Sequence, residues 1–397
     1  MEKVLLFKIG TPLANVNGVA GMSGSPVYVK HTGEWKLVGA YAYGFNQLAP
    51  DGEYLAGVTP IRAMLDQNSA LQGNTFQERN ISNGSIVPKA YKGNVSGLGA
   101  CSVRPLVTFT KVASTKVNIS ADSVFMNFER EPQPGDAVSV LLSRGDFMWY
   151  ATGTVTYVDL SKKTFYAFGH PFLSDLGIGK IEMPAHRAEI ATTIKSQVDS
   201  HKLSARLLEH FGTIEKDGVF AIEGSIGPRT GILLPFSLQV VVDGKTSSYT
   251  FSVVRQKVLA PILLSMGMKT LVDNIYSLET PTLGTMKTMV SFGDNTSLTL
   301  NDSRILEPKQ SLSRSVLERQ EDLFTDFADK ASLLLGSDWN FDVREIRTSL
   351  SFASHAKRLF LDSGAIVNAA GFPIASVKRG ETFYVMFGVR TFDNSAR

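Results

Sequence analysis

A turn with a serine between two glycines, Gly21-Met22-Ser23-Gly24-Ser25-Pro26, runs directly into the strand-like Val27-Tyr28-Val29 and constrains the fold more than any other stretch. Glycine adopts backbone angles that other residues avoid, so the turn can be sharp and another group can approach its backbone closely. A strand, a tight turn and a second strand can present a serine Oγ beside free backbone N–H groups, as acyl transfer requires. The alternative is a hairpin turn whose serine only caps the backbone.

Composition limits the classes of protein that this chain can belong to. The 397 residues, 43% hydrophobic and 19% charged, fit a globular protein of two or three domains. The net charge of +3 comes without a basic stripe interleaved with aromatic residues, so nucleic acid is not an expected partner. No apolar run of 18 residues is present, so no membrane span is expected. The single cysteine, Cys101, excludes an internal disulfide and every multi-cysteine metal site.

Short runs rich in β-branched and aromatic residues, bounded by Gly, Asp and Asn, recur along the chain and predict a mainly β protein. Up to residue 254 these runs are 3–9, 27–30, 35–43, 103–110, 137–142, 147–156, 164–168, 219–223, 233–242 and 247–254. Short helices are expected from Pro60 to Gln67 and over 121–128, and the segment 258–278 also fits a helix.

From about residue 281 the composition shifts, and the pattern predicts a small β-sandwich-like C-terminal domain with one long helix near 313–335. Its expected strands are 286–292, 297–300, 343–351, 358–361 and 382–389. We therefore expect four segments: a serine-bearing part, a crossing rich in Asn, Ser and Gly, a histidine-bearing part and this appendage. Their bounds are 1–70, 71–100, 101–280 and 281–397.

The histidines offer one candidate general base and no metal site. His201 and His210, nine residues apart on an expected helix, would lie too far apart to share a metal, and no cofactor or metal is expected. His170 ends an apolar strand between Gly169 and Pro171. Such a histidine can be purely structural, but beside Ser23 it becomes a candidate general base, because its ordinary pKa suits proton transfer at neutral pH.

The sequence does not decide which aspartate would orient the imidazole. Asp175 follows His170 by five residues, and Asp159 lies in the turn before the histidine strand. Asp136 and Asp146 lie in turns of the same expected sheet, where aspartate is common for local reasons.

Three blocks of the chain resemble the SpoIVB-type peptidase family, bacterial serine endopeptidases grouped with the chymotrypsin-like fold. The serine turn, followed by Lys36-Leu37-Val38-Gly39-Ala40, is similar to the serine motif of the family. Phe168-Gly169-His170-Pro171 is similar to its histidine motif, and Phe211–Asp217, with Gly224 after it, resembles a third block. The resemblance covers roughly residues 5–280.

The resemblance implies a chymotrypsin-like double β-barrel in which Ser23, not Ser25, is the nucleophile. Ser23 precedes His170, whereas the sporulation protease has the opposite order, so the barrel domain is expected to be circularly permuted. Relatives with the permuted order share phrases such as Pro134–Val138 and Gly153–Thr156. The place that holds an aspartate upstream of the serine in the sporulation protease corresponds here to Lys8–Pro12, which has no carboxylate. Those relatives also have further strands before the serine block, so this chain is expected to be incomplete at its beginning.

The expected function is that of a serine endopeptidase acting on protein or peptide substrates, with Ser23 as nucleophile and His170 as base. The backbone N–H of Ser23, with that of Gly21 or Met22, would form the oxyanion hole. The main alternative is an inactive protease-like scaffold that binds protein partners. An esterase-type hydrolase is the third reading, but its serine elbow leads into a long helix, and here a strand follows.

Localisation follows from the same resemblance. Met1-Glu2-Lys3 leads into a strand rather than a signal peptide, so the protein is cytoplasmic or its export signal lies outside this chain. The resemblance favours the bacterial cell envelope or an exported protein. The sequence does not indicate an oligomeric state.

Overall fold

A computed structural model describes most of the expected strands. The described residues are 4–8, 19–45, 55–67, 104–105, 108–113, 130–173, 180–195, 200–227, 229, 233–273, 275, 282–306, 323–336, 342–353 and 359–391. Strands dominate, which confirms the prediction of a mainly β protein. Contacts divide the chain into two compact units, here called unit 1 and unit 2. Unit 1 comprises Met1–Leu234 with Phe251–Leu263, and unit 2 comprises Pro235–Thr250 with Leu264–Arg397.

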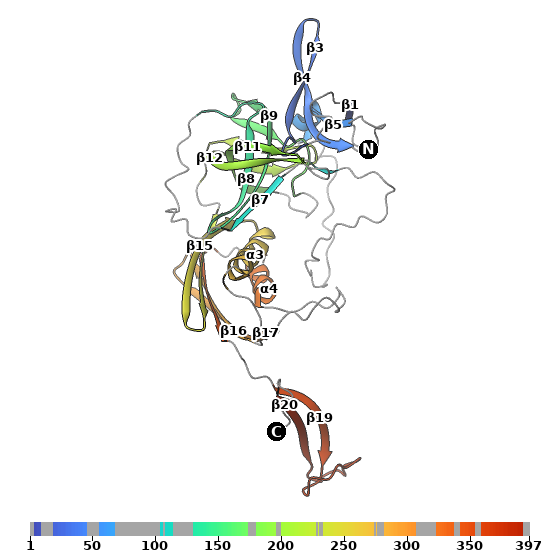
Figure 1. The fold of residues 1–397 in the computed structure, drawn as a ribbon, viewed down its shortest axis with the longest axis vertical. Coiled ribbons are helices and arrows are strands. Elements are labelled where there is room, and N and C mark those ends of the chain that lie inside the picture. Colours follow the sequence, from blue (N-terminus) through green and yellow to red (C-terminus); the bar gives the residue numbers. More distant parts are fainter. Residues whose placement is uncertain are drawn as a thin grey trace. The chain divides into compact units, whose positions relative to one another are not determined.

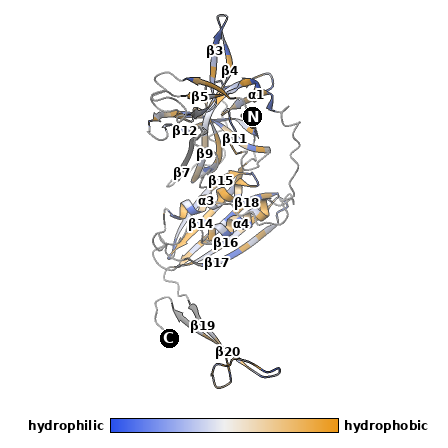
Figure 2. Cartoon of the chain, turned by 90° about the vertical axis from the view of Figure 1, so that its right-hand side faces the viewer, coloured by the Kyte–Doolittle hydropathy of each residue, from blue (hydrophilic) through white to orange (hydrophobic). Residues whose placement is uncertain are grey.

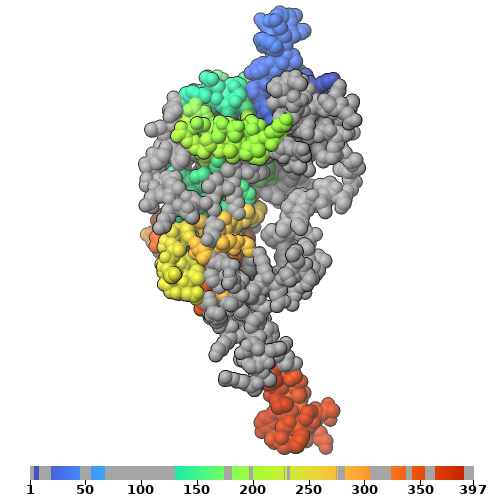
Figure 3. Space-filling view, viewed as in Figure 1, coloured from blue at the N-terminus to red at the C-terminus, as the bar shows by residue number. Residues whose placement is uncertain are grey.

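Unit 1 contains an open antiparallel sheet that carries the serine turn. Its strands, in order, are β1 (Leu5–Lys8), β5 (Leu55–Pro60), β4 (Glu34–Phe45) and β3 (Ser25–His31), with β6 (Arg104–Pro105) also on β4. The short α1 (Ile61–Leu65) follows β5 directly after Pro60, near the expected start. The hairpin of β3 and β4 turns through Thr32 and Gly33, both with positive φ, and extends away from the rest of unit 1 (Figures 1 and 3).

The second sheet of unit 1 closes on itself through six antiparallel strands. In order around the closed sheet these are β8 (Ala137–Gly145), β11 (Lys180–Ile194), β12 (Ser200–Asp217), β13 (Ile222–Ile226), β10 (Thr164–Ala167) and β9 (Phe147–Asp159), which pairs back with β8. Fully buried aromatic residues fill it, and the rings of Phe165 and Phe211 meet edge to face at 5.0 Å. Closure leaves these six strands without a free edge among themselves.

The strands that join this closed sheet include β2 (Val19–Ala20) and β7 (Thr108–Ala113). β2, directly before the serine turn, pairs in parallel with the start of β12, and β7 pairs with β9. The pairing of β2 is one of the links that holds the serine turn on the closed sheet. The expected crossing 71–100, the expected helix 121–128 and Cys101 lie outside the described residues.

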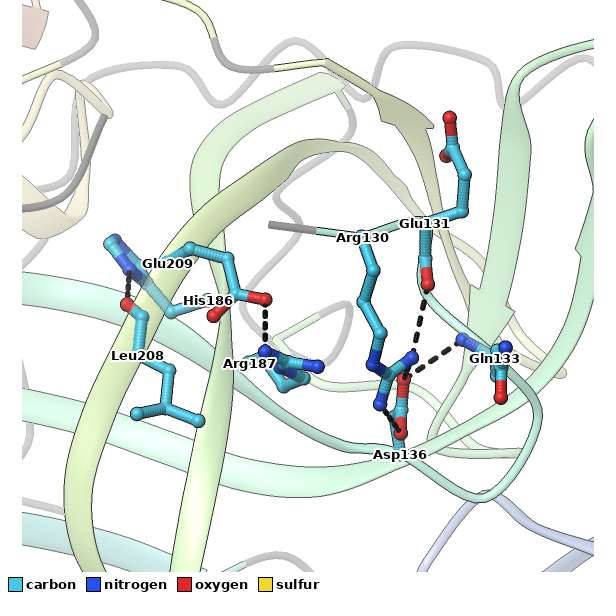
Figure 4. Close-up of polar contacts among 8 residues, drawn as sticks. All are labelled: Arg130, Glu131, Gln133, Asp136, His186, Arg187, Leu208 and Glu209. Atoms are coloured by element: carbon cyan, nitrogen blue, oxygen red, sulfur yellow. Dashed lines mark hydrogen bonds and ion pairs between the residues drawn. The ribbon is translucent and has the colours of Figure 1, made fainter. Parts of the chain in front are cut away.

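The expectation of a helix around His201 and His210 is wrong, because both residues lie on the 18-residue strand β12. This strand pairs along its length with β11 and places His210 opposite His186, with the two rings stacked at 5.1 Å. Next to them, Arg187 forms a largely buried ion pair with Glu209 at 2.6 Å, and His186 Nδ1 bonds to the Leu208 carbonyl at 3.0 Å (Figure 4). The residues around His201 and His210 have good helix propensity, but pairing with the neighbouring strand β11 outweighs it.

Figure 4 also shows how the turn before β8 is fixed. The Arg130 guanidinium donates to both carboxylate oxygens of Asp136, at 2.8 and 2.7 Å, and the Gln133 N–H donates to the same carboxylate at 2.9 Å. Gly135 has a positive φ, and its N–H donates to the Val155 carbonyl of β9. Asp136 is therefore a turn residue.

Unit 2 combines one sheet with two helices. The sheet order is β17 (Ser297–Leu306), β16 (Thr282–Phe292), β18 (Val343–Ala353), β14 (Leu233–Val242) and β15 (Lys245–Val254), with β14 and β18 parallel. α4 (Leu323–Gly336) packs Phe327 against Phe236 of β14, and its Phe324 carbonyl accepts a hydrogen bond from Ser265 of α3 (Leu259–Asp273). Hydrophobic residues recur along β14, β16 and α4 in Figure 2.

This arrangement corrects the β-sandwich expected for the C-terminal region. Among the described residues the larger sheet of unit 2 packs against helix α4 through Phe236 and Phe327, and α3 contacts α4 in turn. β19 (Leu359–Val367) and β20 (Tyr384–Thr391) form a separate two-stranded sheet. Residues 235–250 belong to unit 2, although the boundary expected from the sequence lies near 280.

We expect Gly24→Ala to destabilise unit 1 by about 3 kcal/mol or more, because a Cβ there would come within 2.0 Å of the Thr154 carbonyl oxygen and 2.5 Å of the Phe168 nitrogen. Gly33→Ala is the matched control. Its φ of 89° resembles the 95° of Gly24, but a Cβ at Gly33 meets nothing within 4 Å, so backbone strain alone should cost about 1 kcal/mol. Urea unfolding measures both variants, and equal losses would contradict the close packing of Gly24.

Candidate active site

The serine turn is rigid because its own hydrogen bonds close it on both sides of Ser23. Gly21 and Gly24 have φ values of 91° and 95°, in the region that favours glycine. The Met22 N–H donates to the Val19 carbonyl at 3.1 Å, and the Met22 carbonyl accepts from both the N–H and the Oγ of Ser25. Ser25 is thus used by the turn itself, whereas Ser23 Oγ is fully buried and has no hydrogen-bond partner among the described residues.

Strand β9 of the closed sheet binds this turn by three hydrogen bonds. The Thr154 N–H donates to the Ser23 carbonyl at 2.8 Å, and Thr154 Oγ1 donates to the Gly21 carbonyl at 3.2 Å. Thr156 Oγ1 donates to the Gly24 carbonyl at 2.7 Å. Gly153 precedes these residues, and a Cβ there would lie 3.1 Å from the Ser23 oxygen and 2.5 Å from the Phe168 ring. Glycine at 153 therefore lets the serine and histidine turns approach one strand together.

The histidine turn follows β10 through two residues in the left-handed region. Phe168 and Gly169 have φ values of 71° and 72°, an unfavourable conformation for a bulky residue such as Phe168. The Phe168 N–H donates to the Thr154 carbonyl at 3.3 Å, so this turn binds the same residue of β9 as the serine turn. The Gly169 carbonyl accepts from Thr59 Oγ1 of β5, and a Cβ on Gly169 would strike Ala40 of β4 at 2.6 Å. Both sheets of unit 1 thus fix the histidine turn.

The tautomer of His170 follows from its one hydrogen bond. Its Nδ1 lies 2.6 Å from the Pro171 carbonyl oxygen, and because a carbonyl only accepts, Nδ1 must carry the proton. Nε2 therefore keeps a lone pair, and it is buried without a hydrogen-bond partner. Burial lowers the pKa of His170 to about 4, partly opposed by the Pro171 hydrogen bond, so the ring is neutral at pH 7. The rings of Tyr43 and Phe168 each lie 6.0 Å from it.

The structure thus brings the turns of Ser23 and His170 onto one segment of β9. The two orphan atoms, Ser23 Oγ and His170 Nε2, do not hydrogen-bond to each other, and both side chains are closed off from solvent in this conformation. A neutral imidazole with a free lone pair can act as a general base toward a hydroxyl once the two atoms come within hydrogen-bond distance. Hydrogen bonds of this kind are often long in the absence of substrate.

The backbone N–H groups expected to form the oxyanion hole differ in whether they already donate a hydrogen bond within the turn. The N–H of Met22 donates within the turn, so it could bind an oxyanion only if that bond opened. Among the described turn and loop hydrogen bonds, the Ser23 N–H does not donate to a backbone carbonyl. The Ser23 N–H is therefore a better candidate for that role than the Met22 N–H.

Two of the aspartates considered from the sequence, Asp136 and Asp159, are used within their own turns. Asp159 accepts from the N–H and Oγ of Ser161 and the N–H of Lys162, and so caps the turn after β9. Asp146 lies in the turn between β8 and β9, and Asp175 lies outside the described residues.

Two buried groups near the site were not singled out from the sequence. Asp217, at the end of β12, accepts hydrogen bonds from the backbone N–H groups of Phe172, at 2.7 Å, and Leu173, directly after the histidine turn. Lys202 lies one residue beyond the β2–β12 pairing and donates to Thr154 Oγ1 at 3.3 Å, and burial lowers its pKa. Asp217 belonged to the third block of the family resemblance, and that block was the one available signal for it.

Neither a scan of the chain against models of known families nor a search of curated proteins gave a match. Among the described residues, no three His, Cys, Asp or Glu side chains gather as ligands of a metal ion would. No described helix has the length and apolar character needed to cross a bilayer.

Acid should destabilise the protein through its buried neutral histidines. Burial lowers the pKa of His170 to about 4 and of His186 to about 3, and it also lowers that of His210. The unfolded chain, with histidine pKa values near 6.5, binds more protons, so this stability is present above about pH 6.5 and is lost as the pH falls.

For each of His170 and His186 the expected loss between pH 7 and pH 5 is about 2 kcal/mol, measured by urea unfolding at the two values. His186→Phe keeps a ring against His210 and should reduce the loss by about that amount. An unchanged loss in this variant would contradict a neutral, buried His186.

Proposed function

We propose that the chain is a serine endopeptidase of the SpoIVB type, with a circularly permuted chymotrypsin-like fold, that cleaves proteins through a Ser23–His170 acyl-enzyme mechanism. The observation that carries this proposal is the pair of orphan atoms, Ser23 Oγ and His170 Nε2, on two turns that bind the same segment of β9. Buried polar atoms usually have partners, and two that lack them on adjacent turns favour a chemical role over a structural one.

The steps follow from the chemistry of the two side chains. Ser23 Oγ attacks the scissile carbonyl carbon while His170 Nε2 takes the hydroxyl proton. The tetrahedral oxyanion is bound by the N–H groups of Ser23 and Gly21, and when it collapses the imidazolium protonates the departing amine. Water then attacks the acyl-enzyme by the same route, with His170 again taking and returning a proton. Throughout, Nδ1–H keeps its bond to the Pro171 carbonyl, which leaves the lone pair of Nε2 available for the serine proton.

Access to the site requires movement. Ser23 is 0% and His170 1% exposed, so a substrate reaches the hydroxyl only when neighbouring chain moves aside. The site described is therefore a closed, resting form of the proposed enzyme.

The local fold favours a peptidase over the esterase reading. β3 begins at Ser25, two residues after the proposed nucleophile, whereas the α/β-hydrolase elbow leads into a helix. Two antiparallel β-structures that share the site also agree with a chymotrypsin-like arrangement. The same family assignment carries the proposal that the protein acts in the bacterial envelope or after export.

A second candidate is a protease-like scaffold that binds protein partners without cleaving them. It is favoured by one observation: His170 Nδ1 bonds to a backbone carbonyl, where a fully active triad places a carboxylate that stabilises the imidazolium. Labelling of the serine by a fluorophosphonate separates the two candidates.

Ser23→Ala should abolish fluorophosphonate labelling and lower proteolysis about a thousandfold or more, because the nucleophile is lost while the turn keeps its backbone bonds. His170→Gln should lower labelling of Ser23 by a similar factor. Ser25→Ala is the matched control: it removes a hydroxyl two residues away that bonds only within the turn, and it should label at near the wild-type rate. Wild-type protein that does not label, or Ser23→Ala that still labels, would sink the enzyme assignment.

A further inference from the structure

The carboxylate of Asp217 reaches the histidine turn from β12 and is nearly fully buried. Its Oδ1 accepts the Phe172 N–H at 2.7 Å and its Oδ2 accepts the Leu173 N–H. Hydrogen bonds from N–H groups to an ionised carboxylate are stronger than neutral ones, and two from successive residues fix the backbone between them. Asp217 thus holds the segment directly after His170-Pro171.

One peptide group joins this carboxylate to the imidazole. The Phe172 N–H and the Pro171 carbonyl belong to the same planar peptide unit, so fixing the direction of one fixes that of the other. The carbonyl end of this unit accepts the proton of His170 Nδ1 at 2.6 Å. The chain of bonds therefore runs from Asp217 through one peptide group to the ring, with the proposed base Nε2 on its far side.

We propose that Asp217 is a positioning residue that orients His170 and supports its charged form through the Pro171–Phe172 peptide group. Hydrogen bonds in a row polarise one another, so a carboxylate at the N–H end makes the carbonyl at the other end a stronger acceptor. A stronger acceptor holds the Nδ1–H tautomer and stabilises the imidazolium that forms when Ser23 gives up its proton. The role in catalysis rests on the proposed function, whereas the orientation of the ring does not.

Asp136 and Asp159, two of the aspartates considered from the sequence, have other partners. Asp136 is bound by Arg130, and Asp159 by the backbone and hydroxyl of its own turn. The burial of Asp217, 7% exposed, also separates it from surface turn residues. Its hydrogen bonds go to the two residues after Pro171, so the proposed role acts through the histidine turn.

The test compares Asp217→Asn with Asp159→Asn, which makes the same chemical change in a turn of the same closed sheet. We expect Asp217→Asn to lower the rate of fluorophosphonate labelling of Ser23 by about 10- to 100-fold, while Asp159→Asn labels as wild type does. Circular dichroism and urea unfolding at pH 7 check that both variants fold.

Nitrogen NMR of ¹⁵N-histidine-labelled protein gives the direct readout. Wild type should show His170 as the Nδ1–H tautomer, and Asp217→Asn should show a mixture of the two tautomers. Retention of the wild-type signal in Asp217→Asn overturns the inference, whatever the labelling rate. Wild type that does not label refutes the proposed function alone, because the tautomer still reports on Asp217.

Wild-type protein also tests the link without any substitution, in case Asp217→Asn does not fold. The amide protons of Phe172 and Leu173 should resonate far downfield and exchange slowly with solvent, as expected for N–H groups bonded to a buried carboxylate. Rapid exchange at both amides would overturn the inference.

Discussion

The four residues from Gly153 to Thr156 on β9 are the surface on which the site is assembled. The backbone and side chain of Thr154 bind Ser23 and Gly21, its carbonyl accepts from Phe168, and the Thr156 hydroxyl binds Gly24. Gly153, Thr154 and Thr156 thus contact the serine turn, which lies more than a hundred residues earlier in the sequence. Because one rigid strand holds both turns, their relative position depends on few torsion angles.

The electrostatics of the site differ from those of a triad with a carboxylate in direct contact with histidine. The ring of His170 is neutral because burial penalises its charged form, and a backbone carbonyl fixes its tautomer. A neutral buried base accepts a proton less readily than one beside an anion. The low dielectric around it strengthens its electrostatic interactions with fixed dipoles such as the Pro171 carbonyl. The carboxyl group of Asp217 lies one peptide group away from the ring, so the proposed support for the imidazolium needs no carboxylate in contact with it.

Sequence reasoning predicted most of the strand runs and singled out Ser23 and His170 as candidates, but it did not predict the residues that hold their turns in place. The β14 segment was predicted with its bounds, and β8 and β9 to within three residues, because alternation and turn residues mark these edges clearly. β11 was not predicted: Pro184 and several register shifts interrupt its alternation. β12 was read as a helix near its histidines because the Leu, Ala, Arg and Glu residues there favour helix locally.

Contacts distant in sequence explain the remaining differences. The bonds of Thr154 to the serine turn, and of Asp217 to residues 172 and 173, join segments whose pairing no local pattern encodes. Helices were predicted at 258–278 and near 313–335, close to α3 and α4, but their contact with each other was not predicted, because β16 and β17 separate them in the sequence.

The parallel pairing of β14 with β18 has a consequence for synthesis of the chain on the ribosome. β14 emerges about a hundred residues before β18, and residues 251–263, which belong to unit 1, emerge in between. Unit 1 has all its described strands outside the ribosome while β14 still lacks this neighbour. A loop of that length closes slowly, so the nascent protein passes through a stage in which β14 offers an unpaired edge to chaperones and to other nascent chains.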